Sequence, residues 1–403
     1  MCQGKHLMNT WLNEPVLNHF IVYLLYTINM RLKLIVIAVV AALFISTPAF
    51  AADNIVGNGA SFPANLIDEC KASYSRSTGN LVTYTANGSG AGKTSADVGV
   101  GDFWFSDSAH TASTKKPSII HIPIVAAPIA VIHNLPGNRQ LYLSSSTVAK
   151  IFAGEITMWN DPAIKADNNR KVKEVTYKKD SKGNLVKDKS GNPVILRTTT
   201  KSIVYTLPNQ KIKVIFRLDN SGTTNNFVKY MKAFAPDVWT KPVSDSFSTS
   251  FPKNINDMSN IGRVVGASQS QGVANLAVKT KYSITYAEVS FAKFFNLKVA
   301  NIGNASGNFV EPNSTNVSAF LGEASIDSNN ILTYDYATKE PGAYPLGIVS
   351  YLLADTVGKN KEAVKRWAKY FVSPECVNSK PELGFTLITG KFLEFVNKQI
   401  NRL

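Results

Sequence analysis

The chain has 403 residues, of which 44% are hydrophobic and 18% charged, which is typical of a folded protein with room for two hydrophobic cores. This composition excludes a mainly disordered chain. The formal net charge is +15, but residues 165–201 alone hold 11 Lys or Arg and 4 Asp or Glu, so the basicity is concentrated in one segment. Such a segment favours an anionic partner, whereas no zinc finger, basic helix or aromatic RNA platform indicates nucleic acid.

The N-terminal segment has the features of an export signal. Met30-Arg31-Leu32-Lys33 is basic, an apolar run from Leu34 to Ile45 follows, and Ala49-Phe50-Ala51 matches a small-x-small cleavage site. A run of about 12 residues is too short to cross a hydrocarbon core of ~30 Å, which favours a cleaved signal peptide over a membrane anchor. No cysteine lies at the cleavage site, so no lipid anchor is expected there. We expect residues 1–51 to be an N-terminal extension with a signal peptide that starts at Met30, and the mature protein to be soluble and periplasmic.

From Asn54 onward the chain repeats a simple unit, in which an extended run leads into a loop of Gly, Ser and Asn and then into a helical pattern. The extended runs are Ile55-Val56, Leu81 to Thr85, Phe103 to Asp107 and Ile212 to Phe216. After the first run, Ser61 is expected to cap a helix that Gly79 ends, and after the second a short helix is expected over Lys93 to Val98. Strands that alternate with helices predict parallel βαβ units in an α/β sheet.

Two further apolar runs are candidates for strands that cross between two lobes. The run from Ile119 to Ile132 contains Pro123 and Pro128, which favour an extended strand over a helix. The second candidate is the segment from Pro345 to Tyr351. The helical pattern from Lys361 to Val372 would then return to the first lobe.

The basic segment contains a near-repeat with turn residues. Asp180-Ser181-Lys182-Gly183-Asn184 is followed by Asp188-Lys189-Ser190-Gly191-Asn192, and both are flanked by strand-forming residues. This chemistry predicts an exposed β-hairpin or a short meander. The segment is either a solvated surface insertion or a docking surface for an anionic or protein partner.

Two cysteines lie in the mature part of the chain, Cys70 and Cys376, and both fall in helical patterns near opposite chain ends. A disulfide between them and a pair of buried thiols both agree with the sequence, because spacing carries no information about disulfide geometry.

The stretch from Asn87 to Thr94, NGSGAGKT, is one residue short of the nucleotide-binding loop G-x-x-x-x-G-K-[ST]. Asn87 stands where the first glycine belongs, and no clear aliphatic strand that ends in a magnesium-binding Asp follows. ATP is also scarce outside the cytoplasm. Nucleotide hydrolysis is therefore not expected, and Lys93 and Thr94 are predicted to be ordinary residues of a first helical turn.

A glycine-rich turn at the start of a helix binds anions nevertheless, because its backbone N–H groups and the positive end of the helix dipole point outward. Ser89 adds a hydroxyl donor, and the same arrangement recurs at Ser61-Phe62 and at Ser221-Gly222-Thr223. Together with Arg217, these helix starts predict a site for a compact tetrahedral oxyanion.

Four motifs in this order resemble the ligand motifs of periplasmic phosphate-binding proteins, the PstS family that serves ABC transporters. They are GNGASFP at 57–63, GSGAG at 88–92, FSD at 105–107 and RLDNSGT at 217–223. Further similarity at residues 152–161, 272–274 and 284–288 extends the resemblance over most of residues 54–385. The chain departs from the family at Asn220 and Thr285, where glycine is common, and in the basic segment, which resembles an insertion.

The resemblance implies an α/β, two-lobed periplasmic-binding-protein fold, type II-like, with a ligand cleft between the lobes and two crossing strands. It implies that residues 52–127 and 346–403 form lobe I, and that residues 128–345 form lobe II with the basic hairpin insertion at 168–202. A member of this family would be a monomer that binds inorganic phosphate and delivers it to an inner-membrane ABC permease and its ATPase subunits. No cofactor, metal or enzymatic step is implied.

Carried over by motif, the implied phosphate ligands are Ser61, Phe62 (backbone N–H), Ser89, Asp107, Arg217, Ser221, Gly222 (backbone N–H) and Thr223. Asp219 is implied to orient Arg217, whose guanidinium offers a bidentate fork.

Asp107 is the informative member of this set, because a carboxylate repels an anion in a desolvated site. It is useful there only as an acceptor for a proton that the ligand carries. Phosphate retains a proton at neutral pH and sulfate does not, and rejection of a ligand that lacks the required donor can reach roughly 10⁴–10⁵. The alternative role for Asp107 is that of a helix cap after a strand.

Two alternative functions remain open at this point. A secreted phosphatase-like enzyme could use Ser106, Asp107 and His110, but neighbouring residues on a strand point to opposite faces. His110, His121 and His133 lack metal-ligand spacing and are expected to be core or surface residues. The second alternative is a surface adhesion or signalling protein that uses the basic insertion.

Overall fold

The computed structural model describes residues 22–27, 30, 53–183, 185–189, 193–377 and 381–403. The chain divides into two compact units, Met1–Ala51 and Ala52–Leu403. In the first unit residues 22–27 are helical, and the predicted apolar run and cleavage site lie outside the described residues. None of the helices among the described residues combines the length and hydropathy that a membrane span requires.

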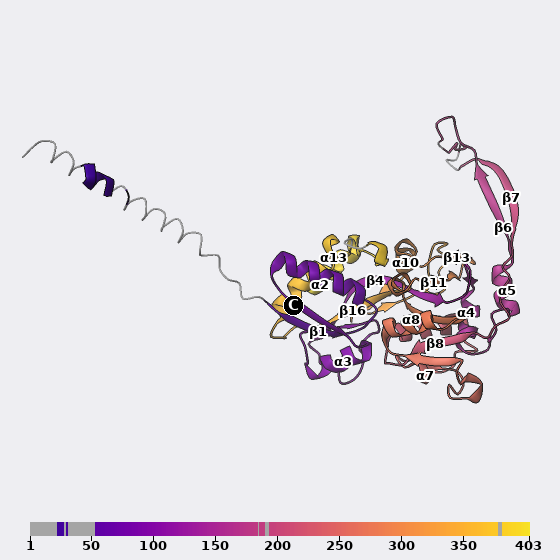
Figure 1. Ribbon diagram of the computed structural model, residues 1–403, viewed down its shortest axis with the longest axis horizontal. Coiled ribbons are helices and arrows are strands. Elements are labelled where there is room, and N and C mark those ends of the chain that lie inside the picture. The colour runs from indigo at the N-terminus through magenta and orange to yellow at the C-terminus, as the bar shows by residue number, and fades with distance from the viewer. Residues whose placement is uncertain (1–21, 28–29, 31–52, 184, 190–192, 378–380) are drawn as a thin grey trace, which may run out of the picture. The chain divides into compact units, whose positions relative to one another are not determined.

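The second unit is organised around a nine-stranded sheet with the order β2-β1-β3-β16-β4-β10-β8-β9, and β11 pairs with β4 off this path (Figure 1). Its strands are β1 (Ile55–Gly59), β2 (Val82–Ala86), β3 (Phe103–Ser106), β4 (Ile119–His133), β8 (Lys213–Arg217), β9 (Val264–Ala267), β10 (Ser283–Glu288), β11 (Lys298–Val299) and β16 (Gly347–Asp355). Strand β1 pairs in parallel with β2 and β3, and β8 pairs in parallel with β9 and β10. The predicted parallel βαβ units are confirmed.

The helices that follow these parallel strands start close to the strand ends. They are α2 (Ala64–Thr78), α3 (Ser89–Val98), α6 (Gly222–Phe234) and α8 (Gln269–Lys279). Gly79 ends α2 in the left-handed conformation, as predicted. Two details of the prediction are wrong: α3 begins at Ser89 and not at Lys93, and Pro63 occupies the N-cap position of α2 that Ser61 was expected to fill.

Close packing explains why glycines occur inside the first turn of α3. A Cβ atom at Gly92 would lie 2.8 Å from both the Cα atom of Gly59 and the carbonyl oxygen of Phe105, so this helix can rest on β1 and β3 only without a side chain there. The glycine-rich stretch is therefore the helix start itself and not a loop before it.

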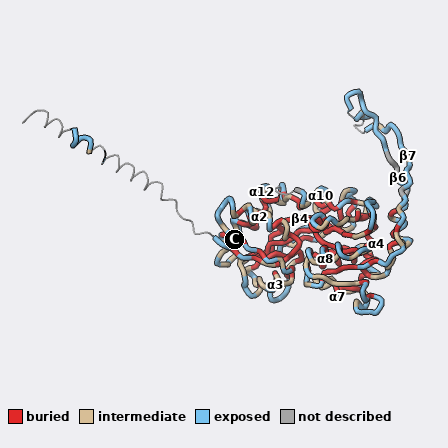
Figure 2. The backbone as a smooth tube through the Cα atoms, in the orientation of Figure 1, coloured by how far each residue is buried: buried red, intermediate tan, exposed pale blue. Residues whose placement is uncertain are grey.

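Strand β4 connects the two halves of the sheet. All of its 15 residues are buried, and Figure 2 shows this buried path through the middle of the unit. Its first part, up to Pro128, pairs with β16, and its last part, from Ile129 to His133, pairs with β10. Pro123 lies opposite a register shift between Ser350 and Tyr351, where a missing backbone donor is tolerated. Both predicted crossing strands are thus present, and they join the lobes of a two-lobed α/β fold.

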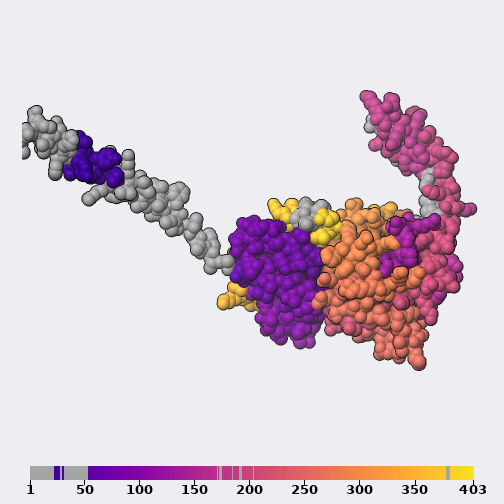
Figure 3. All heavy atoms as spheres, viewed as in Figure 1, coloured from indigo at the N-terminus to yellow at the C-terminus, as the bar shows by residue number. Residues whose placement is uncertain are grey.

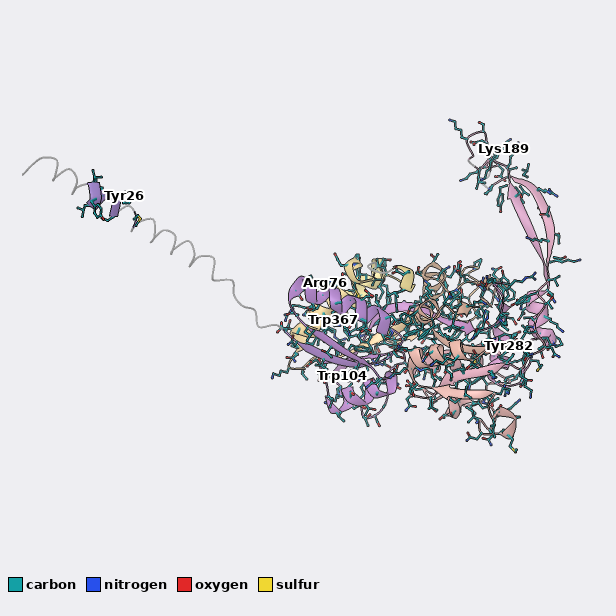
Figure 4. The ribbon with its side chains drawn as sticks, viewed as in Figure 1. Tyr26, Arg76, Trp104, Lys189, Tyr282 and Trp367 are labelled. Atoms are coloured by element: carbon teal, nitrogen blue, oxygen red, sulfur yellow. A yellow bond between two sulfur atoms is a disulfide. The ribbon has the colours of Figure 1, made fainter. Side chains whose placement is uncertain are left out.

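The C-terminal segment returns to the first strands, as predicted. Helix α11 (Lys361–Phe371) carries Trp367, which is labelled in Figure 4. The ring of Trp367 packs against that of Tyr74 on α2, with ring centroids 5.3 Å apart. Cys70 of α2 and Cys376 of α12 (Pro374–Val377) form a disulfide with a Cα–Cα distance of 5.0 Å. The structure therefore selects the disulfide over the pair of free thiols.

The remaining elements extend these layers. They are β5 (Tyr142–Leu143), α4 (Ser145–Phe152), α5 (Pro162–Asn168), α7 (Phe247–Ser250), η1 (Met258–Asn260), α9 (Val289–Phe294), β12 (Asn301–Gly303), β13 (Phe309–Val310), α10 (Ser314–Leu321), β14 (Ser325–Ile326), β15 (Leu332–Thr333), η2 (Pro381–Leu383) and α13 (Gly390–Ile400).

The basic segment forms the predicted hairpin. Strands β6 (Arg170–Tyr177) and β7 (Ile195–Ile203) pair antiparallel in a two-stranded sheet of their own. Figure 3 shows this hairpin, in magenta, standing out beyond α5.

Candidate anion site

The loops that carry three of the four motifs, at 88–92, 105–107 and 217–223, meet at the start of α6. A Cβ atom at Gly222 would lie 2.5 Å from the backbone nitrogen of Ser108 and 2.7 Å from Oγ of Ser89. The backbone N–H of Gly90 also donates to the carbonyl oxygen of Asn220 at 2.9 Å. The ends of β2, β3 and β8 are thereby brought to one place, although they are up to about a third of the chain apart in sequence.

Arg217, at the end of β8, is 1% exposed and is held by Asp219 through two hydrogen bonds. Its Nε donates to Oδ1 of Asp219 at 2.8 Å, and its Nη2 donates to Oδ2 at 2.5 Å. Burial alone would raise the pKa of Asp219, but the hydrogen bonds and charge of Arg217 hold it below its usual range. The guanidinium is therefore fixed in orientation by a partner that stays ionised.

Asp107, directly after β3, is 2% exposed and accepts two hydroxyl hydrogen bonds. Thr223 donates to its Oδ2 at 2.9 Å and Ser350 of β16 donates to its Oδ1 at 2.7 Å. Burial raises the pKa of Asp107 to about 6, although these two donors and the charge of Arg217 act in the opposite direction. The site thus contains a buried carboxyl group that changes protonation state close to neutral pH.

Ser89 and Ser221 use their hydroxyl oxygens as acceptors for backbone amides. Oγ of Ser89 accepts from the N–H of Asp107 at 3.2 Å, and Oγ of Ser221 caps α6 by accepting from the N–H of Thr224 at 3.2 Å. Each hydroxyl keeps its own proton, which it can donate to an anion in front of the helix start.

Ser61 and Phe62 lie at the start of α2. Ser61 is 3% exposed and its Oγ donates to Oγ of Ser270 at 3.2 Å, while it accepts from the backbone N–H of Ser270 at 3.0 Å. This contact replaces the helix-capping role that the sequence predicted. Phe62 is fully buried and packs edge-on against Phe385.

Ser270 was missed by the sequence interpretation, although it links two predicted site residues. Besides its contacts with Ser61, its Oγ accepts from Nη1 of Arg217 at 3.2 Å. It lies in the first turn of α8, and the N–H of Gln269 in the same turn donates to Asp219 at 2.8 Å. The signal that could have found it is the same strand–Ser–helix pattern, which recurs where β9 leads into α8.

Ser350 was also missed, and no local signal identifies it. It lies within the apolar strand β16, 243 positions from its partner Asp107. Only the pairing of β16 with β3 and β4 brings its hydroxyl to the carboxylate.

Lys93 is not the ordinary helix residue that the sequence predicted. Its Nζ donates to Oδ2 of Asp245 at 2.6 Å and to Oγ of Ser108 at 3.0 Å. Asp245 also accepts from Nδ2 of Asn225 on α6 at 3.0 Å. This network fastens α3 to the segment that contains α6, beside the site.

The residues of a hydrolytic triad are not assembled. His110 hydrogen-bonds to Asp97 through Nε2 at 2.7 Å, and the hydroxyl of Ser106 donates to the carbonyl oxygen of Ser108. His121 accepts from the backbone N–H of His110. Within the described ranges, no cluster of three or more His, Cys, Asp or Glu side chains could hold a metal ion.

The chain is similar in sequence to known phosphate-binding proteins. Residues 45–375 match the profile of a PBP superfamily domain. The chain is 34% identical over 286 residues to the phosphate-binding protein PstS 3 of Mycobacterium tuberculosis, a match that covers 68% of this chain and 65% of that protein. It is 33% identical over 310 residues to the phosphate-binding protein PstS 2 of the same organism, covering 73% of this chain and 71% of that protein. The chain therefore spans slightly less than two thirds of the length of the first relative and more than two thirds of the second.

The fold is also that of solved structures. One is a high affinity periplasmic phosphate-binding protein, PfluDING, in a structure bound with phosphate. The TM-score is 0.60 at 20% sequence identity, over 86% of this chain and 93% of the other. At this level of identity the likeness concerns the two-lobed α/β architecture.

Proposed function

This chain belongs to the PstS family of phosphate-binding proteins within the PBP superfamily, and from that membership we propose that it binds inorganic phosphate in the periplasm for an ABC import system. The observation that carries the proposal is the pairing of a fully buried, oriented cation with a buried carboxyl group at the same helix starts. Arg217 supplies positive charge to an oxyanion, and Asp107 accepts a hydrogen bond only from an oxyanion that carries a proton. Phosphate meets both requirements.

The proposed ligand set follows the four motifs. Ser89 and Ser221 donate their remaining hydroxyl protons, Phe62 and Gly222 donate backbone amides at the starts of α2 and α6, and Arg217 donates from its fork. Ser61 and Thr223, whose hydroxyls donate to Ser270 and Asp107 in this structure, complete the proposed shell, and Asp219 is the partner that orients Arg217.

The proposed lobes are residues 52–127 with 346–403, and residues 128–345. Contacts between these two parts surround the site, including those of Lys93 with Asp245 and Gly90 with Asn220. Closure of the lobes on phosphate would present a composite surface to an inner-membrane permease and its ATPase subunits. The mature protein acts as a soluble periplasmic monomer after signal-peptide cleavage, and no chemical step is part of this function.

Isothermal titration of the mature protein with phosphate and with sulfate tests the proposal. We expect phosphate to bind far more tightly than sulfate, and Arg217→Ala to weaken phosphate binding by at least about 2 kcal/mol, because a charge-assisted contact is lost and the Asp219 carboxylate loses its cation. Full affinity in Arg217→Ala, with the fold retained by circular dichroism, would remove Arg217 and with it the proposed site. Equal binding of sulfate would instead contradict the phosphate assignment while leaving the anion site in place.

A further inference from the structure

The hairpin of residues 170–203 has no role in the proposed phosphate site, yet it carries a large share of the charge of the protein. It contains 10 Lys or Arg and 3 Asp or Glu, a net charge of +7. Its two strands pair only with each other, so the structure holds this charge on a separate element. Lys189, labelled in Figure 4, lies at the outer part of this element, away from the large sheet.

Exposed apolar side chains lie among these cations. Tyr177 is 40% exposed, Leu185 45%, Ile195 57% and Leu196 64%. Lys178 follows Tyr177, Lys187 lies two positions after Leu185, and Arg197 follows Leu196; all three cations are exposed. A surface that only had to remain solvated would not need four large apolar side chains beside its lysines.

The base of the hairpin is fixed to the rest of the protein. The backbone N–H of Tyr205 donates to Oδ1 of Asn169 at 2.7 Å, and Arg139 donates to the carbonyl oxygen of Val204 and lies over the ring of Tyr205. The hairpin is thus anchored at one end, while its charged and apolar outer end is available for contact.

We propose that this hairpin docks on the surface of an anionic phospholipid membrane. Lysines at such a surface are attracted by lipid phosphates, and their aliphatic stems can lie along the apolar boundary. Tyr, Leu and Ile side chains are stabilised at the same boundary between headgroups and acyl chains. A soluble polyanion such as an acidic polysaccharide would match the charge of the hairpin but would leave its apolar side chains exposed to water. The lipid surface matches both the charged and the apolar side chains.

The docking is peripheral, because two strands cannot satisfy their outer backbone groups inside the hydrocarbon core. It goes beyond phosphate binding and does not depend on it: the hairpin would hold the protein at the membrane surface whether or not the anion site is occupied.

Vesicle co-sedimentation of the mature protein tests the proposal, with mixed phosphatidylglycerol–phosphatidylcholine vesicles against pure phosphatidylcholine vesicles. We expect binding to the mixed vesicles only, and weaker binding as salt is raised. Each lysine that is removed from the hairpin should weaken the binding of the protein to the mixed vesicles by about fivefold.

Matched variants separate the hairpin from overall charge. One variant changes four hairpin lysines to Gln, and its control changes four exposed lysines elsewhere, so that both lose the same net charge. The hairpin set is Lys178, Lys182, Lys187 and Lys189, and the control set is Lys253, Lys279, Lys281 and Lys359. A third variant replaces residues 170–203 by a Gly-Asn-Gly turn between Asn169 and Val204. The hydrogen bond from the backbone N–H of Tyr205 to Asn169 holds these two chain ends close together.

The expected result is that the first and third variants lose vesicle binding, that the control variant retains most of it, and that all of them bind phosphate like the unchanged protein. Replacement of Tyr177, Ile195 and Leu196 by Ser should also weaken binding to the vesicles. The proposal is overturned if the unchanged protein does not bind mixed vesicles, or if the two lysine variants lose binding equally. It is also overturned if heparin binds as tightly as the vesicles and the Ser replacements have no effect, because the partner would then be a soluble polyanion.

Discussion

At the scale of single residues, the anion site depends on two buried charged groups with different environments. Arg217 has Asp219 as a partner that fixes its geometry, so its cost of burial is offset within the protein. Asp107 has hydroxyl donors but no cation in hydrogen-bond contact among the described residues, and burial therefore raises its pKa to about 6. In the proposed function, Arg217 attracts the oxyanion and Asp107 selects for the proton that the oxyanion carries.

The Asp107→Asn variant tests this division of roles. Asn offers an N–H donor where the carboxylate only accepts, so phosphate should weaken by about 2 kcal/mol and sulfate should no longer be excluded. Calorimetric titration with both anions measures the change. An unchanged ratio of phosphate to sulfate affinity would show that Asp107 does not select the ligand.

The sequence identified most residues that meet at the site but not those that support them. Ser61, Ser89 and the start of α6 were predictable because each follows a strand at the start of a helix, a pattern with a known anion-binding property. Arg217 instead ends strand β8, and Asp107 was inferred from the family motif. Ser270 follows the same pattern and could have been identified. Ser350 could not, because its position beside Asp107 results from strand pairing across 243 positions.

At the scale of elements, the site depends on how closely α6 approaches α3 and the end of β3. The approach at Gly222 leaves no space for even a methyl group, since a Cβ atom there would lie within 3 Å of three atoms of Ser89, Asp107 and Ser108. A glycine at this position therefore permits the contact that brings the motifs together.

The Gly222→Ala variant should weaken phosphate binding by about 1–3 kcal/mol, because overpacking separates the two helix starts. Gly272→Ala on α8 is the matched control, since the nearest atom to a Cβ there is 3.8 Å away. Titration with phosphate compares the two variants. Equal affinities would mean that the approach of α6 does not limit binding.

Helices and strands could be predicted where the local sequence pattern determines them. The crossing strand β4, the helix α11 and the basic hairpin appear where the sequence indicated them. The start of α3 was predicted four residues too late, because glycine-rich sequence is typical of loops and only the contact of Gly92 with β1 and β3 explains a helix there. Packing between elements overrides local propensity at such positions.

At the scale of the whole molecule, buried histidines couple stability to pH. Burial lowers the pKa of His121 to about 4 and that of His133 to about 3. In the unfolded chain both would bind a proton near the ordinary pKa of about 6.5, so stability is lost as pH falls from that value towards the folded pKa values. Burial raises the pKa of Asp107 to about 6 and that of Glu288 to about 8. These two groups therefore add stability as pH falls through their folded pKa values, because protonation removes a buried charge.

The His133→Phe variant isolates one of these contributions. Between pH 6.5 and pH 4 the unchanged protein should lose up to about 1.4 kcal/mol per pH unit through His133, and the variant should lack this part of the slope. Urea unfolding at several pH values measures the free energy of unfolding of both proteins. Parallel pH profiles would show that His133 is not neutral in the folded protein.

The position of β16 has a consequence for the order in which the protein can fold. This strand, residues 347–355, lies between β3 and β4 in the sheet, and the disulfide that joins α2 to α12 spans 306 positions. Strands β1, β2 and β3 can pair with one another early, but β3 cannot be joined to the rest of the sheet until β16, near the end of the chain, has been synthesised. Strands β8, β9 and β10 pair over shorter sequence distances than β3 and β16 do, and the longest-range pairing is the slower step. The part of the sheet that is synthesised first is therefore the last to be joined to the rest.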